Sequence, residues 1–233
     1  MNIALFGYGK MGKLIEQIAM KRDHTIVAVK DIDTPAVDFS NVDIGIDFST
    51  PEAAIGNILS CLENGIPIIS GTTGWLEKYE EVTAVCKEKN GAFLYASNFN
   101  LGVNVFFALN ARLAELMNPL KDYKAEIEEV HHVHKLDAPS GTAITLAEDI
   151  ISNSDYAAWQ LNAALEGTVP VYSKRMGEVP GTHTVTYSSP IDNLEIKHTA
   201  HNREGFALGA VVAAEWLVGK TGVYTMKDVL NLS

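Results

Sequence analysis

The chain has 233 residues, a length that can bury either one large hydrophobic core or two smaller ones. Its composition, with 47% hydrophobic and 20% charged residues, is ordinary for a soluble globular protein. A formal net charge of −11 disfavours nucleic acid and anionic membranes as binding partners.

In chain order, the first part of the sequence alternates between predicted strands and predicted helices. One helix begins cleanly at Pro51, because Thr50 is suited to cap it and Glu52 favours the positive end of its dipole. Strands separated by helices predict a parallel sheet with right-handed crossovers. The strands are expected at residues 2–6, 25–29, 43–48, 66–70 and 92–95, and two further helices at 10–21 and 75–89.

The second half has a different pattern, which predicts an α+β domain. In a predicted strand at 123–134 the apolar side chains change face near Glu128 and Glu129, which indicates a bulge or a bend. Residues 153–180 give no clear pattern. Helices are expected at 101–117, 142–151 and 206–218, and antiparallel strands at 182–188 and 194–200.

Two sequence features bear on the cellular compartment. Nothing after Met1 resembles a secretory signal, and no apolar run is long enough to span a bilayer. Cys61 and Cys86 lie in helix-like segments, where we expect them to be buried and reduced. We therefore expect a cytoplasmic protein.

The first turn carries a Gly7-x-Gly9-x-x-Gly12 pattern between a predicted strand and a predicted helix, a context typical of dinucleotide binding. Gly7 permits the tight turn, Gly9 lets the backbone approach a pyrophosphate, and Gly12 lets the helix pack closely on the strand. Asp31 follows about 20 residues on, where an acid normally binds the adenosine ribose. Asp31 favours NAD, but Lys30 can pair with the extra phosphate of NADP, so the preference stays open.

Two further loops follow predicted strands. They are Gly71-Thr72-Thr73-Gly74 and Ala96-Ser97-Asn98-Phe99. Because ligands of open α/β sheets bind at the carboxyl ends of the strands, both loops are expected to face the cofactor. For the first loop, a plain strand-to-helix turn is the alternative.

The most unusual segment is His131-His132-Val133-His134-Lys135-Leu136-Asp137-Ala138-Pro139-Ser140-Gly141-Thr142. Imidazoles and an ammonium at one end, with helix N-terminal N–H groups at the other, suit a small anionic substrate that must be protonated. His131 and Lys135 are expected on one strand face, and we expect a pKa near neutrality for His131. The alternatives are exposed histidines, a surface lysine and a simple helix cap.

Other functions fit parts of the pattern. His132 and His134 on one strand face would suit zinc, but the familiar spacing of ligands is absent, so no metal is predicted. The rivals are another two-domain dehydrogenase (acting on aspartate semialdehyde or homoserine), a non-catalytic dinucleotide sensor, and a zinc hydrolase. A thiol-dependent aldehyde dehydrogenase would need a reactive cysteine in a turn, which neither cysteine provides.

Over nearly its whole length the chain resembles the 4-hydroxy-tetrahydrodipicolinate reductase (dihydrodipicolinate reductase) family of lysine and diaminopimelate biosynthesis. The histidine–lysine segment is highly specific for that family, whereas the glycine pattern alone is not. The other matching segments are Gly71-Thr72-Thr73-Gly74, Asp47-Phe48-Ser49-Thr50-Pro51, Ser97-Asn98-Phe99-Asn100-Leu101-Gly102-Val103-Asn104, Arg175-Met176-Gly177, Gly181-Thr182-His183-Thr184-Val185, and Arg203 with Phe206-Ala207-Leu208-Gly209-Ala210.

The resemblance implies an α/β fold with two domains. A Rossmann-type parallel-sheet domain would comprise residues 1–99 with 205–233, and a central α+β domain, 100–204, would bind substrate and form a homotetramer. The implied reaction is the reduction of 4-hydroxy-tetrahydrodipicolinate, a small dicarboxylate, to tetrahydrodipicolinate with NADH or NADPH. Water would leave the hydroxylated substrate, a hydride would reach C4 of the cyclic unsaturated imine, and the protein would then supply a proton.

The resemblance also implies roles for individual residues. By matching position, His131 would be the catalytic acid/base and Lys135 a second proton donor. The substrate would be held by His132, Ser140, Gly141 and Thr142. The cofactor would be contacted by Gly7, Tyr8, Gly9, Lys10, Met11, Gly12, Asp31, Gly71, Thr72, Thr73, Ala96, Ser97, Asn98 and Phe99. The chain departs from many relatives in being shorter between the second and third strands and in carrying Thr182 where a glutamate is common.

Overall fold

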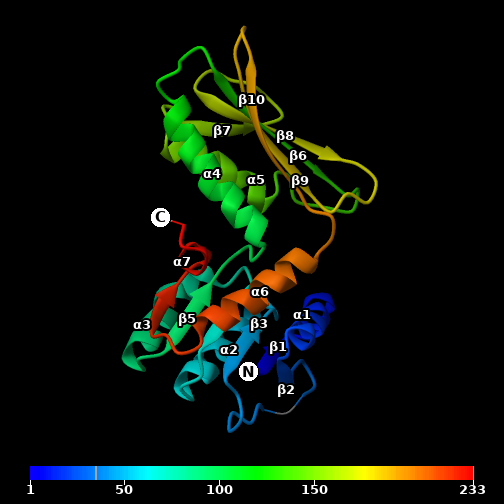
Figure 1. The fold of residues 1–233 in the computed structure, drawn as a ribbon, viewed down its shortest axis with the longest axis vertical. Helices are drawn as coiled ribbons and strands as arrows, with labels where there is room; N and C mark the ends of the chain where they lie inside the picture. The colour runs from blue at the N-terminus through cyan, green and yellow to red at the C-terminus, as the bar shows by residue number, and fades with distance from the viewer. Residues whose placement is uncertain (35, 233) are drawn as a thin grey trace. The chain divides into compact units, whose positions relative to one another are not determined.

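A computed structural model describes residues 1–34 and 36–232 of the chain. The chain divides into two compact units (Figure 1). The first unit comprises Met1–Leu101 and Glu204–Ser233, and the second comprises Gly102–Arg203. In the part of the chain that the model covers, no helix combines the length and the apolar character that crossing a membrane requires.

The first unit is built on a six-stranded parallel sheet with the strand order β11-β5-β4-β3-β1-β2. The parallel sheet predicted from the alternating pattern is therefore confirmed. One strand, β11, was not expected, because its three residues are too few to show a period. The strands are β1 (Asn2–Phe6), β2 (Thr25–Lys30), β3 (Ile44–Asp47), β4 (Ile68–Ser70), β5 (Ala92–Tyr95) and β11 (Gly222–Tyr224).

Helices cover both faces of this sheet (Figure 1). Alternate strand residues face opposite cores: Ile3 and Leu5 pack with α1 and α6, whereas Phe6 packs with α2 and α3. Each such side chain contributes roughly 1.5–3 kcal/mol by leaving water. The apolar helix α6 thus belongs to this unit. The helices are α1 (Lys10–Lys21), α2 (Pro51–Glu63), α3 (Tyr79–Glu88), α6 (Glu204–Leu217) and α7 (Met226–Leu230), with a 3-10 turn, η1 (Leu76–Lys78), before α3.

The second unit has a five-stranded mixed sheet with the order β10-β9-β6-β8-β7. Its core lies between this sheet and two helices, α4 (Leu101–Met117) and α5 (Gly141–Ser152). The expected antiparallel pair is present as β9 (Thr182–Ser188) and β10 (Asn193–Thr199). The other strands are β6 (Lys124–His131), β7 (Ala158–Leu161) and β8 (Thr168–Arg175), of which β7 and β8 occupy the stretch that showed no pattern.

Two expectations about local structure are wrong. Strand β6 has no bulge: its register with β9 and β8 is unbroken, and Ala125, Ile127, Glu129 and His131 share the buried face. The apolar alternation stops there because the inward positions change from apolar to polar residues. Thr50 does occupy the N-cap of α2, but its side chain makes no capping hydrogen bond.

Candidate active site

In the first unit, the predicted dinucleotide loops lie at the carboxyl edge of the sheet. The chain leaves β1 toward β2 on one side and then returns to β3 on the other, so strand order reverses between β1 and β3. Ligands of open α/β sheets bind at such a switch point. The loops after β1, β3, β4 and β5 all leave from this edge, because the strands are parallel.

The glycine turn after β1 is shaped by close backbone contacts. Gly7 has a φ of 87°, and a Cβ atom there would lie 2.2 Å from the carbonyl oxygen of Phe48. A Cβ on Gly12 would lie 2.3 Å from the carbonyl oxygen of Gly7, so only glycine lets α1 approach β1 this closely. Gly9 differs, because nothing lies within 4 Å of its missing side chain and no side chain caps α1 there. The uncapped N-terminus of α1 therefore has room for a phosphate.

A buried carboxylate fixes the two neighbouring loops. Asp47, at the end of β3, is fully buried and accepts hydrogen bonds from Ser49 Oγ (2.6 Å) and Ser70 Oγ (2.8 Å). It also accepts from Thr72 Oγ1 (2.7 Å) and Asn57 Nδ2 (3.0 Å). Burial raises the pKa of Asp47 and outweighs these four neutral donors.

Several residues that were predicted to contact the cofactor make contacts within the protein. The Tyr8 hydroxyl donates to Glu16, and the Thr72 hydroxyl is engaged by Asp47. The Phe99 ring is 1% exposed in the core, so only its backbone can face a ligand. Lys10, Asp31, Thr73 and Ser97 are exposed, whereas Met11, Gly71, Ala96 and Asn98 are partly exposed.

The adenosine end of the predicted site is a tight turn after β2. Asp31 accepts a hydrogen bond from the backbone of Ile32 through Oδ1 (3.0 Å). Its own N–H donates to the Thr34 hydroxyl (2.7 Å). The Lys30 ammonium donates to the carbonyl oxygen of Thr34 (2.7 Å), so this turn already uses the one cation that was expected to favour NADP.

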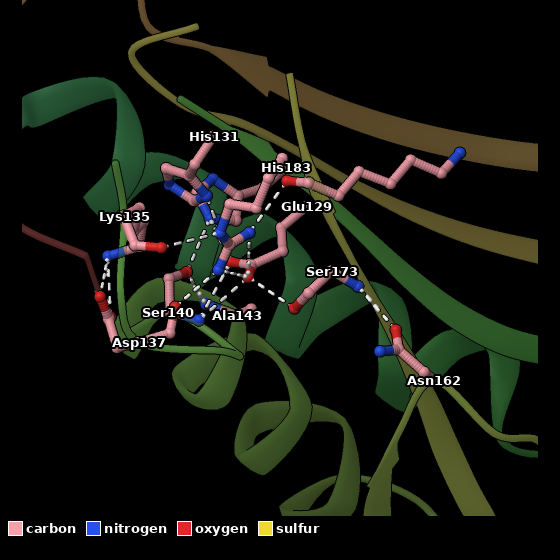
Figure 2. A network of polar contacts seen from close by, with 11 residues as sticks. Glu129, His131, Lys135, Asp137, Ser140, Ala143, Asn162, Ser173 and His183 are labelled. Atoms are coloured by element: carbon pink, nitrogen blue, oxygen red, sulfur yellow. Dashed lines mark hydrogen bonds and ion pairs between the residues drawn. The ribbon is translucent and has the colours of Figure 1, made fainter. Parts of the chain in front are cut away.

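The second unit holds a polar cluster at the end of β6 (Figure 2). At its centre lies Glu129, which has no exposed surface. Its carboxylate accepts from the Ser140 N–H (3.1 Å to each oxygen) and from Ser173 Oγ (2.7 Å). Both terminal nitrogens of the Arg175 guanidinium, Nη1 and Nη2, lie 3.4 Å from Glu129 Oε1. Burial alone would raise the pKa of Glu129, but the hydrogen bonds with His183, Ser140 and Ser173 hold it well below its usual range.

His131 lies beside this carboxylate and is 7% exposed. Its Nδ1 is 3.5 Å from Glu129, and its ring meets that of His183 edge-on, with centroids 5.0 Å apart. Burial, aided by the positive charges nearby, lowers the pKa of His131 from 6.5 to about 4, although Glu129 acts in the opposite direction. The expectation of a near-neutral pKa is therefore wrong for the ligand-free protein.

Lys135 does not share a strand face with His131, because β6 ends at His131 and Lys135 lies in the loop beyond a turn. Its ammonium binds both oxygens of Asp137, at 2.7 and 2.8 Å. Partial burial acts to raise the pKa of Asp137, but the ammonium holds it below its usual value. Arg175 donates to the carbonyl oxygens of Lys135 (3.3 Å) and Asp137 (2.6 Å) and so fixes this loop to β8.

The segment ends at the N-terminus of α5. Ser140 is the N-cap, and its Oγ accepts a hydrogen bond from the Ala143 N–H (3.2 Å). Gly141 and Thr142 form the first turn, and Gly141 is exposed. The Ser140 hydroxyl also lies 3.1 Å from His183 Nε2, which links this helix end to the cluster. The structure thus brings His131 and Ser140 together around Glu129.

His132 and His134 lie outside the cluster. Their rings are 6.1 Å apart in the turn after β6, where His134 pairs with Glu178. The expectation that they share a strand face is wrong, because both follow the last residue of β6.

A different trio has the spacing of a metal site. The potential ligand atoms of Glu129, His131 and His183 all lie within 4.8 Å of one another. However, Glu129 already accepts two strong hydrogen bonds, and Arg175 places a positive charge 3.4 Å from it. A cation here would compete with these donors and be repelled by the guanidinium. The surroundings of the Glu129 carboxylate therefore suit an imidazole neighbour better than a metal ion.

Four residues of this cluster were not identified as site residues from the sequence: Glu129, Ser173, Arg175 and His183. For Glu129 a signal existed, because it stands two residues before His131 and therefore shares its strand face. The other three come from β8 and β9, and only the pairing of these strands with β6 brings them close.

The fold and these two sites define a class: a dinucleotide-binding oxidoreductase with a Rossmann-type unit and a separate α+β unit. Family models agree, since "Dihydrodipicolinate reductase, N-terminus" matches residues 1–99 and "Dihydrodipicolinate reductase, C-terminus" matches residues 102–230. The chain belongs to the dihydrodipicolinate reductase family.

Relatives cover the whole chain. A Christiangramia forsetii protein named 4-hydroxy-tetrahydrodipicolinate reductase is 57% identical over 99% of this chain and 98% of its own length. One of the same name from Archaeoglobus fulgidus is 35% identical over 99% of this chain and 100% of its own. The dipicolinate-bound dihydrodipicolinate reductase of Paenisporosarcina sp. TG-14 has the same fold, with a TM-score of 0.78 and 22% identity over 97% of each chain.

Proposed function

We propose that this chain catalyses the NAD(P)H-dependent reduction of 4-hydroxy-tetrahydrodipicolinate to tetrahydrodipicolinate in lysine and diaminopimelate biosynthesis. The observation that carries the proposal is the segment 131–142, which joins a buried imidazole to a helix N-terminus in a chain 57% identical to a reductase of that name. Fold-level likeness alone would leave the substrate open.

Residues 1–99 with 205–233, which fall within the first unit, form the proposed dinucleotide domain. The open N-terminus of α1 at Gly9 fits a pyrophosphate, since a phosphate there meets N–H groups and no side chain. Bound NADH or NADPH supplies the hydride to C4 of the substrate. Asp31 is exposed at the end of β2, where it can meet the adenosine ribose, and we propose no preference between the two cofactors.

Residues 100–204, which include the second unit, form the proposed substrate domain. The N-terminus of α5, at Ser140, Gly141 and Thr142, would hold one carboxylate of the substrate through its N–H groups and dipole. His132 would contact the same dicarboxylate. Binding energy at these groups goes into orienting the ring.

His131 and Lys135 are the proposed proton donors. The 4-hydroxyl group must leave as water, and its loss gives a conjugated C=C–C=N system. Hydride addition to C4 of this system places negative charge on the ring, so a proton must follow. The Lys135 ammonium is held by Asp137 and can exchange this carboxylate for a substrate carboxylate without losing an ionic partner. Because burial lowers the pKa of His131 to about 4, this side chain would need a negative charge beside it to carry a proton at neutral pH.

The Lys135→Ala variant tests this assignment. We expect kcat to fall by about 100-fold, the usual scale for a general acid, while NADH binding stays intact. Thr142→Val should act mainly on the KM of the dicarboxylate. The matched control is Lys174→Ala, since this lysine pairs with Glu128 and faces away from the cluster. An unchanged kcat in Lys135→Ala would favour the dinucleotide-sensor alternative.

The other rivals have less support. A thiol-dependent dehydrogenase needs an accessible thiolate, but Cys61 and Cys86 are both buried, and burial raises the pKa of each thiol. A zinc hydrolase would need Glu129, His131 and His183 as metal ligands. The Arg175 guanidinium already pairs with the carboxylate of Glu129.

A cytoplasmic homotetramer is part of the same proposal. In the second unit the helices α4 and α5 pack on one side of the sheet, so the other side is available to further copies of the chain. Light scattering of the purified protein would give the number of subunits.

A further inference from the structure

We propose that Glu129 is the positioning residue of the second unit, where it holds the proton donor His131 and the anion-binding end of α5 in one arrangement. The inference rests on the proposed function, because it assigns a task to a residue that does not itself touch the substrate. It adds a residue that neither the glycine pattern nor the histidine–lysine segment contains.

The Glu129 carboxylate contacts groups from several segments of the chain. Glu129 comes from β6, and the groups that surround it come from the turn before α5, from β8 and from β9. Figure 2 shows these side chains converging on it, with dashed lines leading to Ser140 and Ser173. One buried side chain therefore joins four segments that are distant in sequence.

The His131 imidazole and the N-terminal end of α5 both meet the same Glu129 carboxylate. Its Oε2 lies 3.5 Å from His131 Nδ1 and 3.1 Å from the backbone nitrogen of Ser140. The Ser140 N–H fixes the residue that caps α5, so the direction of the first turn depends on Glu129. Moving the carboxylate would displace the imidazole and the helix end together.

The charge of Glu129 also acts on the protonation of His131. The groups that face His131 are Glu129, His183, Lys135 and Arg175. Of these, only Glu129 favours the protonated imidazole, while the others oppose it. A purely apolar or neutral residue at position 129 would leave the imidazole among positive charges, so it would hold a proton less readily.

The carboxylate is also locked in place. Arg175 contacts it and, through the carbonyl oxygens of Lys135 and Asp137, holds the loop of the second proton donor. Breaking a buried ion pair by removing one partner is costly, so the position tolerates few substitutions. Both proton donors thus depend on the Glu129–Arg175 pair.

The test compares Glu129→Gln with Ser173→Ala. Glu129→Gln keeps the shape and removes the charge, so we expect kcat to fall at least about tenfold and its basic limb to move to lower pH by about one unit or more. Ser173→Ala keeps the charge of Glu129 and removes one hydrogen bond that holds its carboxylate in place. We therefore expect kcat to fall about fivefold, with the basic limb of its pH profile unmoved. In both variants the KM of the dicarboxylate should rise and that of NADH should not.

The matched control is Glu128→Gln, which makes the same change one residue away, at a half-exposed position paired with Lys174. It should leave kcat and the pH profile unchanged. If Glu129→Gln does not fold, Ser173→Ala still decides the question. The proposal is overturned if Ser173→Ala matches the wild type, or if a folded Glu129→Gln loses activity equally at every pH.

A separate readout distinguishes this proposal from the proposed function. The ring signals of His131 can be followed by NMR in the ligand-free protein, with no turnover. Glu129→Gln should lower the titration midpoint of His131 whatever reaction the protein performs, and an unmoved midpoint would overturn the proposal. If instead the midpoint moves but His131→Gln keeps full activity, it is the proposed function that fails.

Discussion

Binding of a dicarboxylate to this protein should take up a proton at His131. In the ligand-free protein the pKa of His131 is about 4, because the ring is buried among Lys135, Arg175 and His183, with only Glu129 opposing them. At neutral pH about one molecule in a thousand then carries the imidazolium. Charging this ring at pH 7 costs about 4 kcal/mol, at 1.36 kcal/mol per pH unit.

Two substrate carboxylates can supply this energy. At an effective dielectric constant of about 20, a negative charge about 5 Å from the imidazolium contributes roughly 3 kcal/mol, and a second one about 7 Å away roughly 2 kcal/mol. Together they raise the pKa of His131 to near neutrality. We therefore expect close to one proton to be taken up per ligand at a pH of about 6.5.

Calorimetric titration measures this number. Pyridine-2,6-dicarboxylate would be titrated into protein saturated with NADH, in buffers that differ in their ionisation enthalpy. The slope of the apparent binding enthalpy against that enthalpy gives the protons exchanged. His131→Gln is the control, and its uptake should disappear while binding persists. Equal uptake in both proteins, or tight binding without uptake by the wild type, would refute the reasoning.

The depressed pKa has a second consequence that needs no ligand. Between about 4 and 6.5 the unfolded chain binds a proton at His131 that the folded protein does not. The free energy of unfolding should therefore fall as the pH drops through this window, by a total of about 3 kcal/mol. Urea unfolding at several pH values would show this slope, and His131→Gln should reduce it.

Further predictions concern the first unit. Gly12→Ala should lower the free energy of unfolding by about 1–3 kcal/mol, because its Cβ would lie 2.3 Å from a carbonyl oxygen, whereas Gly9→Ala should melt like the wild type and weaken NADH binding. Cys61 and Cys86 should react with a thiol reagent only after unfolding, and reaction in the native protein would contradict their burial. Asp47→Ala should cost at least about 3 kcal/mol in urea unfolding, and Asp47→Asn less than half as much, since an amide keeps an acceptor for the nearby donors. Equal losses would mean that the charge, not the hydrogen bonding, stabilises this edge.

Local signals in the sequence were enough for most of the first unit and for helix α4 of the second. Helices α1 and α4 have the bounds that were expected, and the glycine turn stands between β1 and α1 as its motif requires. These features depend on neighbours in the chain: a turn residue, a proline at the first helical position, or an apolar period. The three-residue strand β11 escaped because it exists only by pairing with β5.

Strand β8 shows why the stretch 153–180 could not be assigned. It contains Pro170, which argues against a central strand. In the structure β6 pairs with β8 only from Val171 onward, so at Pro170 the strand has a single neighbour, β7. The proline is therefore placed where no hydrogen bond to β6 is required, an arrangement that depends on register and leaves no local trace.

The buried acids of the two units show where sequence reasoning has to end. Asp47 and Glu129 both occupy inward strand positions with no exposed surface. The donors around Asp47 are hydroxyls and an amide, so burial dominates and its pKa rises. Burial also acts to raise the pKa of Glu129, but the hydrogen bonds with His183, Ser140 and Ser173 outweigh it, so the pKa falls. Which partners a buried acid meets is decided by strand pairing, and the direction of its pKa follows from those partners rather than from its depth.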